Sequence, residues 1–195
     1  TTSRHATGGE RPVRWTASVE QVPPFSSPPM TTPAETADAL RATSFLEGFT
    51  DAHLWKLSRL VTPLTLVPDD SIFSEGEARQ RFAILISGAV AIEKSSDGRT
   101  TRLVTLGAGE AVGEGLLLDD SAHGTTARVI MPGIAMVLAR AQLDDITRES
   151  PQLYAALVAR AARAISARLR RAAAGAPRGR RAQICRRCPQ RQRSP

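Results

Sequence analysis

A glycine-rich stretch near the middle of the chain, Gly113-Glu-Gly-Leu-Leu-Leu118, has residue types suited to binding an anion. Gly113 lets the backbone approach a ligand closely, because a Cβ there would collide with it. A helix that begins at this stretch would present unpaired amides and the positive end of its dipole. Because helix starts of this kind bind anions, the stretch is the strongest candidate for ligand chemistry in the chain.

Two further groups of residues have types that do chemistry but lack the setting for it. Cys185 and Cys188 have the spacing of half a zinc knuckle, yet a structural zinc site needs four ligands. The histidines that could complete such a site are scattered along the chain, at His5, His53 and His123. The sequence also contains no nucleophile-elbow, Walker or zinc-protease pattern. We therefore expect no metal site, no catalytic residue and no cofactor, and the chain is not predicted to be an enzyme.

The basic character of the chain is concentrated at its C-terminal end. The formal net charge is +7 over 195 residues. Residues 34–167 carry 13 basic and 17 acidic side chains, whereas residues 168–195 carry ten arginines and no acidic residue. A mildly acidic body argues against a dedicated nucleic-acid-binding domain. The tail alone could bind polyanions, without sequence preference.

Composition divides the chain into one domain and two tails. Residues 1–33 are rich in Thr, Ser, Pro and Gly without periodicity, which predicts a disordered leader, and Met30 is a candidate true start. Residues 34–174 are predicted to fold, and residues 175–195 to form a basic disordered tail that is either functional or a truncated end. With no signal peptide, no apolar run of about 18 residues and only two cysteines, the expected location is the cytoplasm.

The periodicity of the predicted domain changes from helical to β and back to helical. Thr50 is the predicted N-cap of a helix that ends before Pro63. A β-roll is predicted over about 64–139, because short strands alternate there with Gly- and Pro-containing turns, among them a hairpin at Asp97-Gly98. The seven predicted strands are Leu64–Val67, Ser71–Ser74, Phe82–Ile86, Ala89–Glu93, Thr101–Leu106, Thr125–Met131 and Ile134–Leu138.

Two helices are predicted to follow the roll. A short one spans Ala141–Arg148, and a long one spans about 151–174, with Ser150 as N-cap and Pro151 at its first position. The long helix has an apolar seam that repeats every four residues, at Leu153, Leu157, Ala161, Ile165 and Leu169. This alanine-rich seam predicts close packing, either onto the roll or onto a second copy of the helix, with Arg160 on another face.

The order of helices, compact β-roll and long C-terminal helix resembles the cyclic-nucleotide-binding domain family over about 44–172. The resemblance begins with Phe45–Val61 as the leading helices and continues through Pro68–Gly76, Phe82–Val90 and Leu103–Leu118, whose four glycine motifs have the family's order and spacing. The resemblance implies a mainly β fold, the jelly-roll type with flanking helices, and a phosphate-binding cassette after Gly113. It also implies that Glu114 accepts a hydrogen bond from the ribose 2′-hydroxyl, and that the residues from Leu116 form the cassette helix.

The end of the cassette departs from the family pattern. The family closes it with Pro-Arg-Ser or Pro-Arg-Ala, whereas this chain has Ala122-His123-Gly124, so the arginine that grips the phosphate is replaced by His123. A neutral imidazole donates one hydrogen bond and has no permanent charge, which would cost about one to three powers of ten in affinity. The resulting candidate ligand-binding residues are Gly113, Glu114, Gly115, Leu116, Leu117, His123, Gly124 and Thr125.

Two functions are consistent with this pattern. The chain is either a sensor domain that binds cyclic AMP or cyclic GMP weakly, or a degenerate roll that serves as a scaffold. In both cases the C-terminal helix is expected to form a homodimer or to dock a partner protein, and no membrane span is expected. Relatives that regulate transcription carry a helix-turn-helix after the long helix; only about twenty residues follow it here, so this output domain is expected to be lacking.

Overall fold

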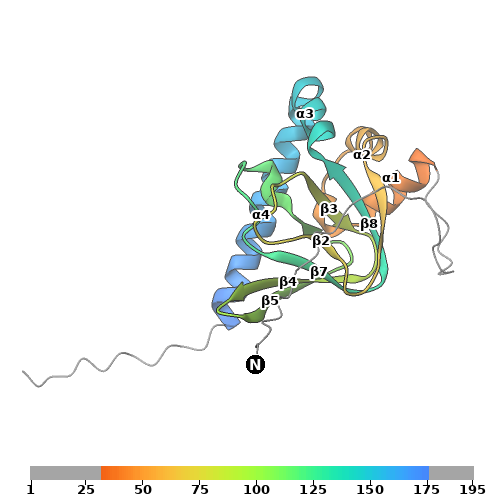
Figure 1. Ribbon diagram of the computed structural model, residues 1–195. Coiled ribbons are helices and arrows are strands. Elements are labelled where there is room, and N and C mark those ends of the chain that lie inside the picture. The colour runs from red at the N-terminus through yellow and green to blue at the C-terminus, as the bar shows by residue number, and fades with distance from the viewer. Residues whose placement is uncertain (1–31, 176–195) are drawn as a thin grey trace, which may run out of the picture.

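The computed structural model describes residues 32–175 (Figure 1). The predicted disordered segments 1–33 and 175–195 therefore lie almost entirely outside the described residues, as do Cys185 and Cys188. At the N-terminal boundary Thr32 caps helix α1 (Pro33–Arg41) in a capping box with Glu35. The folded domain thus begins with Thr32 and Pro33, slightly before the predicted boundary at residue 34.

Two short helical elements lie between α1 and the first strand. A 3₁₀ turn, η1 (Ser44–Leu46), precedes helix α2 (Asp51–Ser58), and the Thr50 hydroxyl accepts the His53 amide as the predicted N-cap. The prediction that this helix continues almost to Pro63 was wrong, since it ends at Ser58. Pro63 lies inside strand β1 (Thr62–Leu66), which is the edge of its sheet, and an edge strand tolerates a residue without an amide proton.

Eight antiparallel strands form two four-stranded sheets, in the orders β1-β8-β3-β6 and β2-β7-β4-β5. All seven predicted strands are present, and the positive φ angles of Asp97 and Gly98 form the predicted hairpin turn. The eighth strand, β6, was missed, because two residues are too short to show a periodicity. The remaining strands are β2 (Ser71–Phe73), β3 (Arg81–Leu85), β4 (Ala89–Ser96), β5 (Arg99–Gly107), β6 (Ala111–Val112), β7 (Thr126–Met131) and β8 (Gly133–Ala139).

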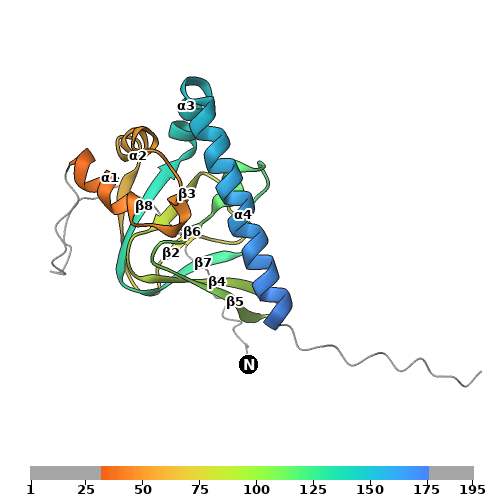
Figure 2. The same ribbon diagram turned by 180° about the vertical axis from the view of Figure 1, so that it is seen from behind.

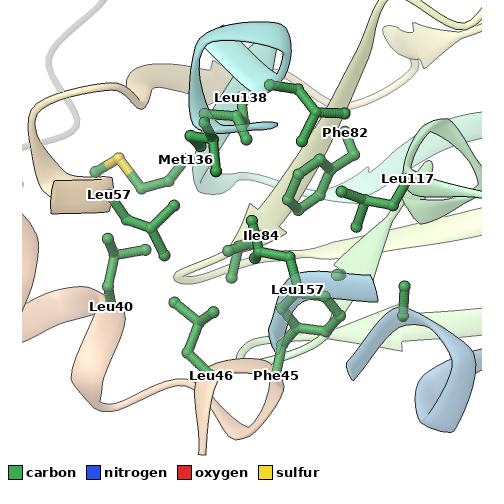
Figure 3. Packing of buried hydrophobic residues seen from close by; sticks show 14 of the residues in the cluster. Leu40, Phe45, Leu46, Leu57, Phe82, Ile84, Leu117, Met136, Leu138 and Leu157 are labelled. Atoms are coloured by element: carbon green, nitrogen blue, oxygen red, sulfur yellow. The ribbon is translucent and has the colours of Figure 1, made fainter. Parts of the chain in front are cut away.

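Strand β3 is buried on both faces and separates two hydrophobic clusters. Ala83 and Leu85 point between the two sheets, whereas Phe82 and Ile84 point toward the helices. Figure 3 shows the helix-side cluster, where residues of α1, α2, η1 and α4 surround Phe82 and Ile84. Because side chains alternate between the two faces of a strand, β3 contributes to the core between the sheets and also to the contact between the roll and the helices.

Helix α3 (Arg140–Glu149) leads into α4 (Pro151–Gly175), which runs along the roll from α3 to the β4–β5 hairpin (Figures 1 and 2). Leu153, Leu157 and Ala161 are buried against the roll, which confirms close packing of the first half of the seam. No helix in residues 32–175 is long and apolar enough to cross a membrane.

The second half of the predicted apolar seam does not pack against the roll. Steps of four residues drift by about 40° around an α-helix. Leu169, four steps after Leu153, is therefore turned outward and is 70% exposed. Arg160 was also placed incorrectly, because its guanidinium donates to the carbonyl oxygens of Ser44 and Phe45 and ties α4 to η1.

Candidate functional site

The predicted cassette begins with a left-handed glycine followed by one short 3₁₀ turn, η2 (Glu114–Leu117). Gly113 has φ +79°, and a Cβ added there would lie 3.0 Å from Phe73 Cε1 and 3.1 Å from the Arg81 carbonyl oxygen. The close approach that requires glycine is therefore an approach to β2 and β3 of the same chain. Leu116 and Leu117 are buried in the helix-side cluster, and the Tyr154 hydroxyl of α4 donates to the Leu117 carbonyl oxygen over 3.3 Å.

Glu114, the first residue of η2, is 2% exposed. Its carboxylate is bound by α4: Arg168 Nη1 lies 2.5 Å from Glu114 Oε1, and Arg168 Nη2 donates to the Ala111 carbonyl oxygen over 2.9 Å. Burial raises the pKa of the Glu114 carboxyl, and the charge of Arg168 partly offsets this. The carboxylate expected to face a ribose is thus held by a guanidinium from the C-terminal helix.

A second arginine lies over the middle of the cassette. The Arg79 guanidinium carbon is 2.8 Å from the place where a Cβ of Gly115 would be, so a larger residue there would displace the guanidinium. Arg79 Nη1 donates to the Gly115 carbonyl oxygen over 3.3 Å and forms an ion pair with Asp119. A permanent positive charge therefore lies against the cassette, supplied by the loop before β3.

His123, at the end of the cassette, is 6% exposed and stacks on Phe73, with ring centroids 3.6 Å apart and an interplanar angle of 8°. Its backbone pairs with the β2–β3 loop, since its amide donates to the Glu77 carbonyl and its carbonyl accepts the Gly76 amide. Burial lowers the pKa of the His123 imidazole, and nearby Arg79 adds to the effect. The imidazole is therefore neutral at pH 7, as expected from the sequence.

The last two predicted residues connect the cassette to β7. Gly124 is exposed, and its carbonyl oxygen accepts a hydrogen bond from Lys94 Nζ over 3.1 Å. Lys94 also pairs with Glu75, which lowers the pKa of that carboxyl. Thr125 is half-buried at the start of the strand. The charged groups around this end are thus paired with one another.

The fold brings the two ends of the predicted cassette together through one side chain. Phe73 lies under both Gly113 and the His123 ring. Sequence reasoning missed Phe73, Arg79 and Arg168, although the position of Arg168, about three helical turns after the buried Leu157, signals that it faces the roll. Within the described part of the chain no three His, Cys, Asp or Glu side chains gather as metal ligands.

A roll of two antiparallel sheets, with a glycine-led short helix beneath a long C-terminal helix, defines a β-roll of the regulatory-domain type. Residues 63–150, from β1 to the end of α3, match the family model of the cyclic nucleotide-binding domain. This match supports the resemblance: residues 63–150 are similar to that family's domain.

Known proteins similar to the chain agree with this placement. The CRP-like cAMP-activated global transcriptional regulator of Mycobacterium tuberculosis is 26% identical over 135 residues, which are 69% of this chain and 58% of that protein. The chain thus spans less than two thirds of the length of this relative.

Two solved structures have the same fold. A cyclic nucleotide-binding domain from Methylobacillus flagellatus has a TM-score of 0.62 at 18% identity, covering 72% of this chain and 79% of that one. The N-terminal domain of a transcriptional regulator from Streptomyces coelicolor A3(2) has a TM-score of 0.55 at 26% identity, covering 70% and 94%. These structures confirm the predicted jelly-roll fold class.

Proposed function

We propose that this domain is a non-enzymatic sensor that binds a cyclic nucleotide, cyclic AMP or cyclic GMP, with weak affinity in the cassette between Gly113 and Thr125. The observation that carries the proposal is the buried Glu114 carboxylate at the start of η2, in a domain similar to that of the cyclic nucleotide-binding family. The similar protein of Mycobacterium tuberculosis is a cAMP-activated regulator, which supports the choice of ligand class.

Weak binding follows from the groups that would meet the phosphate. His123 is neutral and engaged in a stack, so it offers no permanent charge at the position where the family has arginine. Arg79 supplies a guanidinium beside Gly115, but Asp119 competes for it. A phosphate would therefore bind through backbone amides and a shared cation, which is weaker than a dedicated bidentate arginine.

Binding would also require Glu114 to exchange partners. Its oxygen atoms can accept the ribose hydroxyl only if Arg168 yields part of its hydrogen bonding. Since Arg168 is on α4, ligand binding at Glu114 would change how the end of this helix is held. Ligand binding in the cassette could in this way change how α4, the helix expected to dimerise or dock, contacts a partner.

A scaffold without ligand is the second candidate, and one observation favours it. Both His123, which stacks on Phe73, and Glu114, which pairs with Arg168, already have partners within the domain and do not need a ligand. A scaffold would use the outward side of α4, where Leu169 is exposed, to contact a second copy or a partner protein. Binding of polyanions by the basic tail would be compatible with either candidate.

Isothermal titration of the full chain with cyclic AMP and cyclic GMP separates the two candidates. A sensor would give saturable binding, with dissociation constants in the high micromolar to millimolar range, for at least one nucleotide. Glu114→Ala is the matched variant, because it removes the ribose acceptor while keeping every arginine of the tail. Equal heats for wild type and Glu114→Ala would place any binding outside the cassette and favour the scaffold.

A further inference from the structure

A second candidate ligand site lies outside the cassette, between the C-terminal half of α4 and the surface formed by η1 and the β5–β6 turn. The groove there has a volume of about 430 Å³, within the range of small-molecule sites. Its floor is apolar, with Phe45 on the η1 side and Ala164 and Ala167 on the helix. The last turns of α4 lie near the β4–β5 hairpin in both views (Figures 1 and 2).

Arginines dominate the rim of this groove. Five of its lining residues are arginines of α4 and two are glutamates, Glu47 and Glu110, so the lining carries an excess of positive charge. At about 100° per residue, the five arginines fall within an arc of about 160° around the helix axis. They are Arg160, Arg163, Arg168, Arg170 and Arg171.

Three of the five arginines are already engaged by the protein. Arg160 donates to backbone carbonyls of η1, Arg168 pairs with Glu114, and Arg171 pairs with Glu110 over 3.0 Å. Among the described residues the Arg163 guanidinium has no hydrogen bond or ion pair, and the Arg170 guanidinium donates only to the Ser166 hydroxyl. Two guanidinium groups at the groove therefore lack an anionic partner within residues 32–171.

We propose that this groove binds a phosphomonoester with an apolar or aromatic body. Guanidinium groups match the oxygens of a phosphate in a planar, forked geometry, and Arg163 and Arg170 are the pair available for it. The apolar floor formed by Phe45, Ala164 and Ala167 would hold the body of the ligand. A dianion is favoured because it balances the excess positive charge of the lining.

Titration of the full chain with phenyl phosphate, followed by ¹H–¹⁵N chemical shifts, tests this site. The probe contains no ribose, and the location of its chemical-shift changes distinguishes binding in this groove from binding in the cassette. We expect saturable shifts in residues around Phe45 and Ala167, and at least tenfold weaker binding in the double variant Arg163→Gln/Arg170→Gln. The charge-matched control Arg59→Gln/Arg99→Gln, which removes two exposed arginines elsewhere, should stay within twofold of wild type.

Two additional measurements fix the location and the ligand class. Ala167→Glu places a carboxylate in the groove and should weaken phenyl phosphate binding at least tenfold. Inorganic phosphate and benzoate should each bind at least fivefold more weakly than phenyl phosphate, since one lacks the body and the other the dianion. Absence of saturable shifts, equal losses in the two double variants, or equal affinity for the three probes would overturn the proposal.

Discussion

The Arg168 guanidinium, on the last turns of α4, lies 2.5 Å from the Glu114 carboxylate at the start of η2. The Glu114 side chain is 3% exposed and the Arg168 side chain 20%, so the pair is largely removed from solvent. It joins the C-terminal helix to the residue that the family resemblance assigns to ribose binding. Stability and ligand binding are therefore expected to respond to Arg168 in opposite directions.

Arg168→Gln should lower the free energy of unfolding by roughly 1–3 kcal/mol, because it leaves the buried carboxylate without its cation. The same change should tighten cyclic-nucleotide binding several-fold, since Glu114 no longer has to exchange partners. Urea unfolding and titration calorimetry measure the two effects. Arg170→Gln on the same helix is the control and should change stability by less than about 0.5 kcal/mol. Weaker nucleotide binding in Arg168→Gln would show that the arginine assists the ligand instead of competing with it.

His123 should make the fold sensitive to mild acid. Its pKa is lowered in the folded state, chiefly by burial, so protonation favours the unfolded chain. The stability due to the neutral imidazole is present above the ordinary histidine pKa of about 6.5 and is lost as pH falls below it, by up to about 1.4 kcal/mol per pH unit. Urea unfolding at pH 7.5 and 5.5 measures this loss, and His123→Gln should reduce it. An unchanged pH dependence in His123→Gln would contradict the assignment.

Gly113 should be the more costly of two left-handed glycines to replace. Gly113→Ala combines a φ of +79° with a contact of 3.0 Å to Phe73, whereas Gly98→Ala combines a φ of +71° with open space. Both changes incur backbone strain of about 1 kcal/mol, and Gly113→Ala should lose about 1–2 kcal/mol more through displaced packing. Thermal unfolding of the two variants compares them directly. Equal losses would mean that Phe73 moves aside without cost.

Ala161 and Ala162 test which side of α4 is buried. Ala161 is fully buried against the roll and Ala162 is exposed. Ala161→Glu should destabilise the domain by about 2–4 kcal/mol, because it forces a charge into the helix-side cluster. Ala162→Glu should remain within about 0.5 kcal/mol of wild type. Melting temperatures give the comparison, and similar values for both variants would refute the packing of α4.

Sequence patterns predicted the roll well because strand periodicity and glycine turns are local signals. Leu153, Leu157 and Ala161 were placed correctly on the buried face of α4 for the same reason. Extending the four-residue seam to Leu169 failed, since the repeat drifts around the helix and brings Arg168 inward instead. The contacts of the cassette with Phe73 and Arg79 join elements distant in sequence, so no local pattern could reveal them.

Titration calorimetry of His123→Arg with cyclic AMP and cyclic GMP tests the central proposal, a nucleotide cassette that lacks only its permanent cation. Compared with wild type, His123→Arg should bind at least one nucleotide tenfold or more tightly, because a forked guanidinium replaces a neutral imidazole. Adding Glu114→Ala should abolish the gain by removing the ribose acceptor. A folded His123→Arg variant that binds neither nucleotide at millimolar concentration would contradict the sensor function and leave the scaffold in its place.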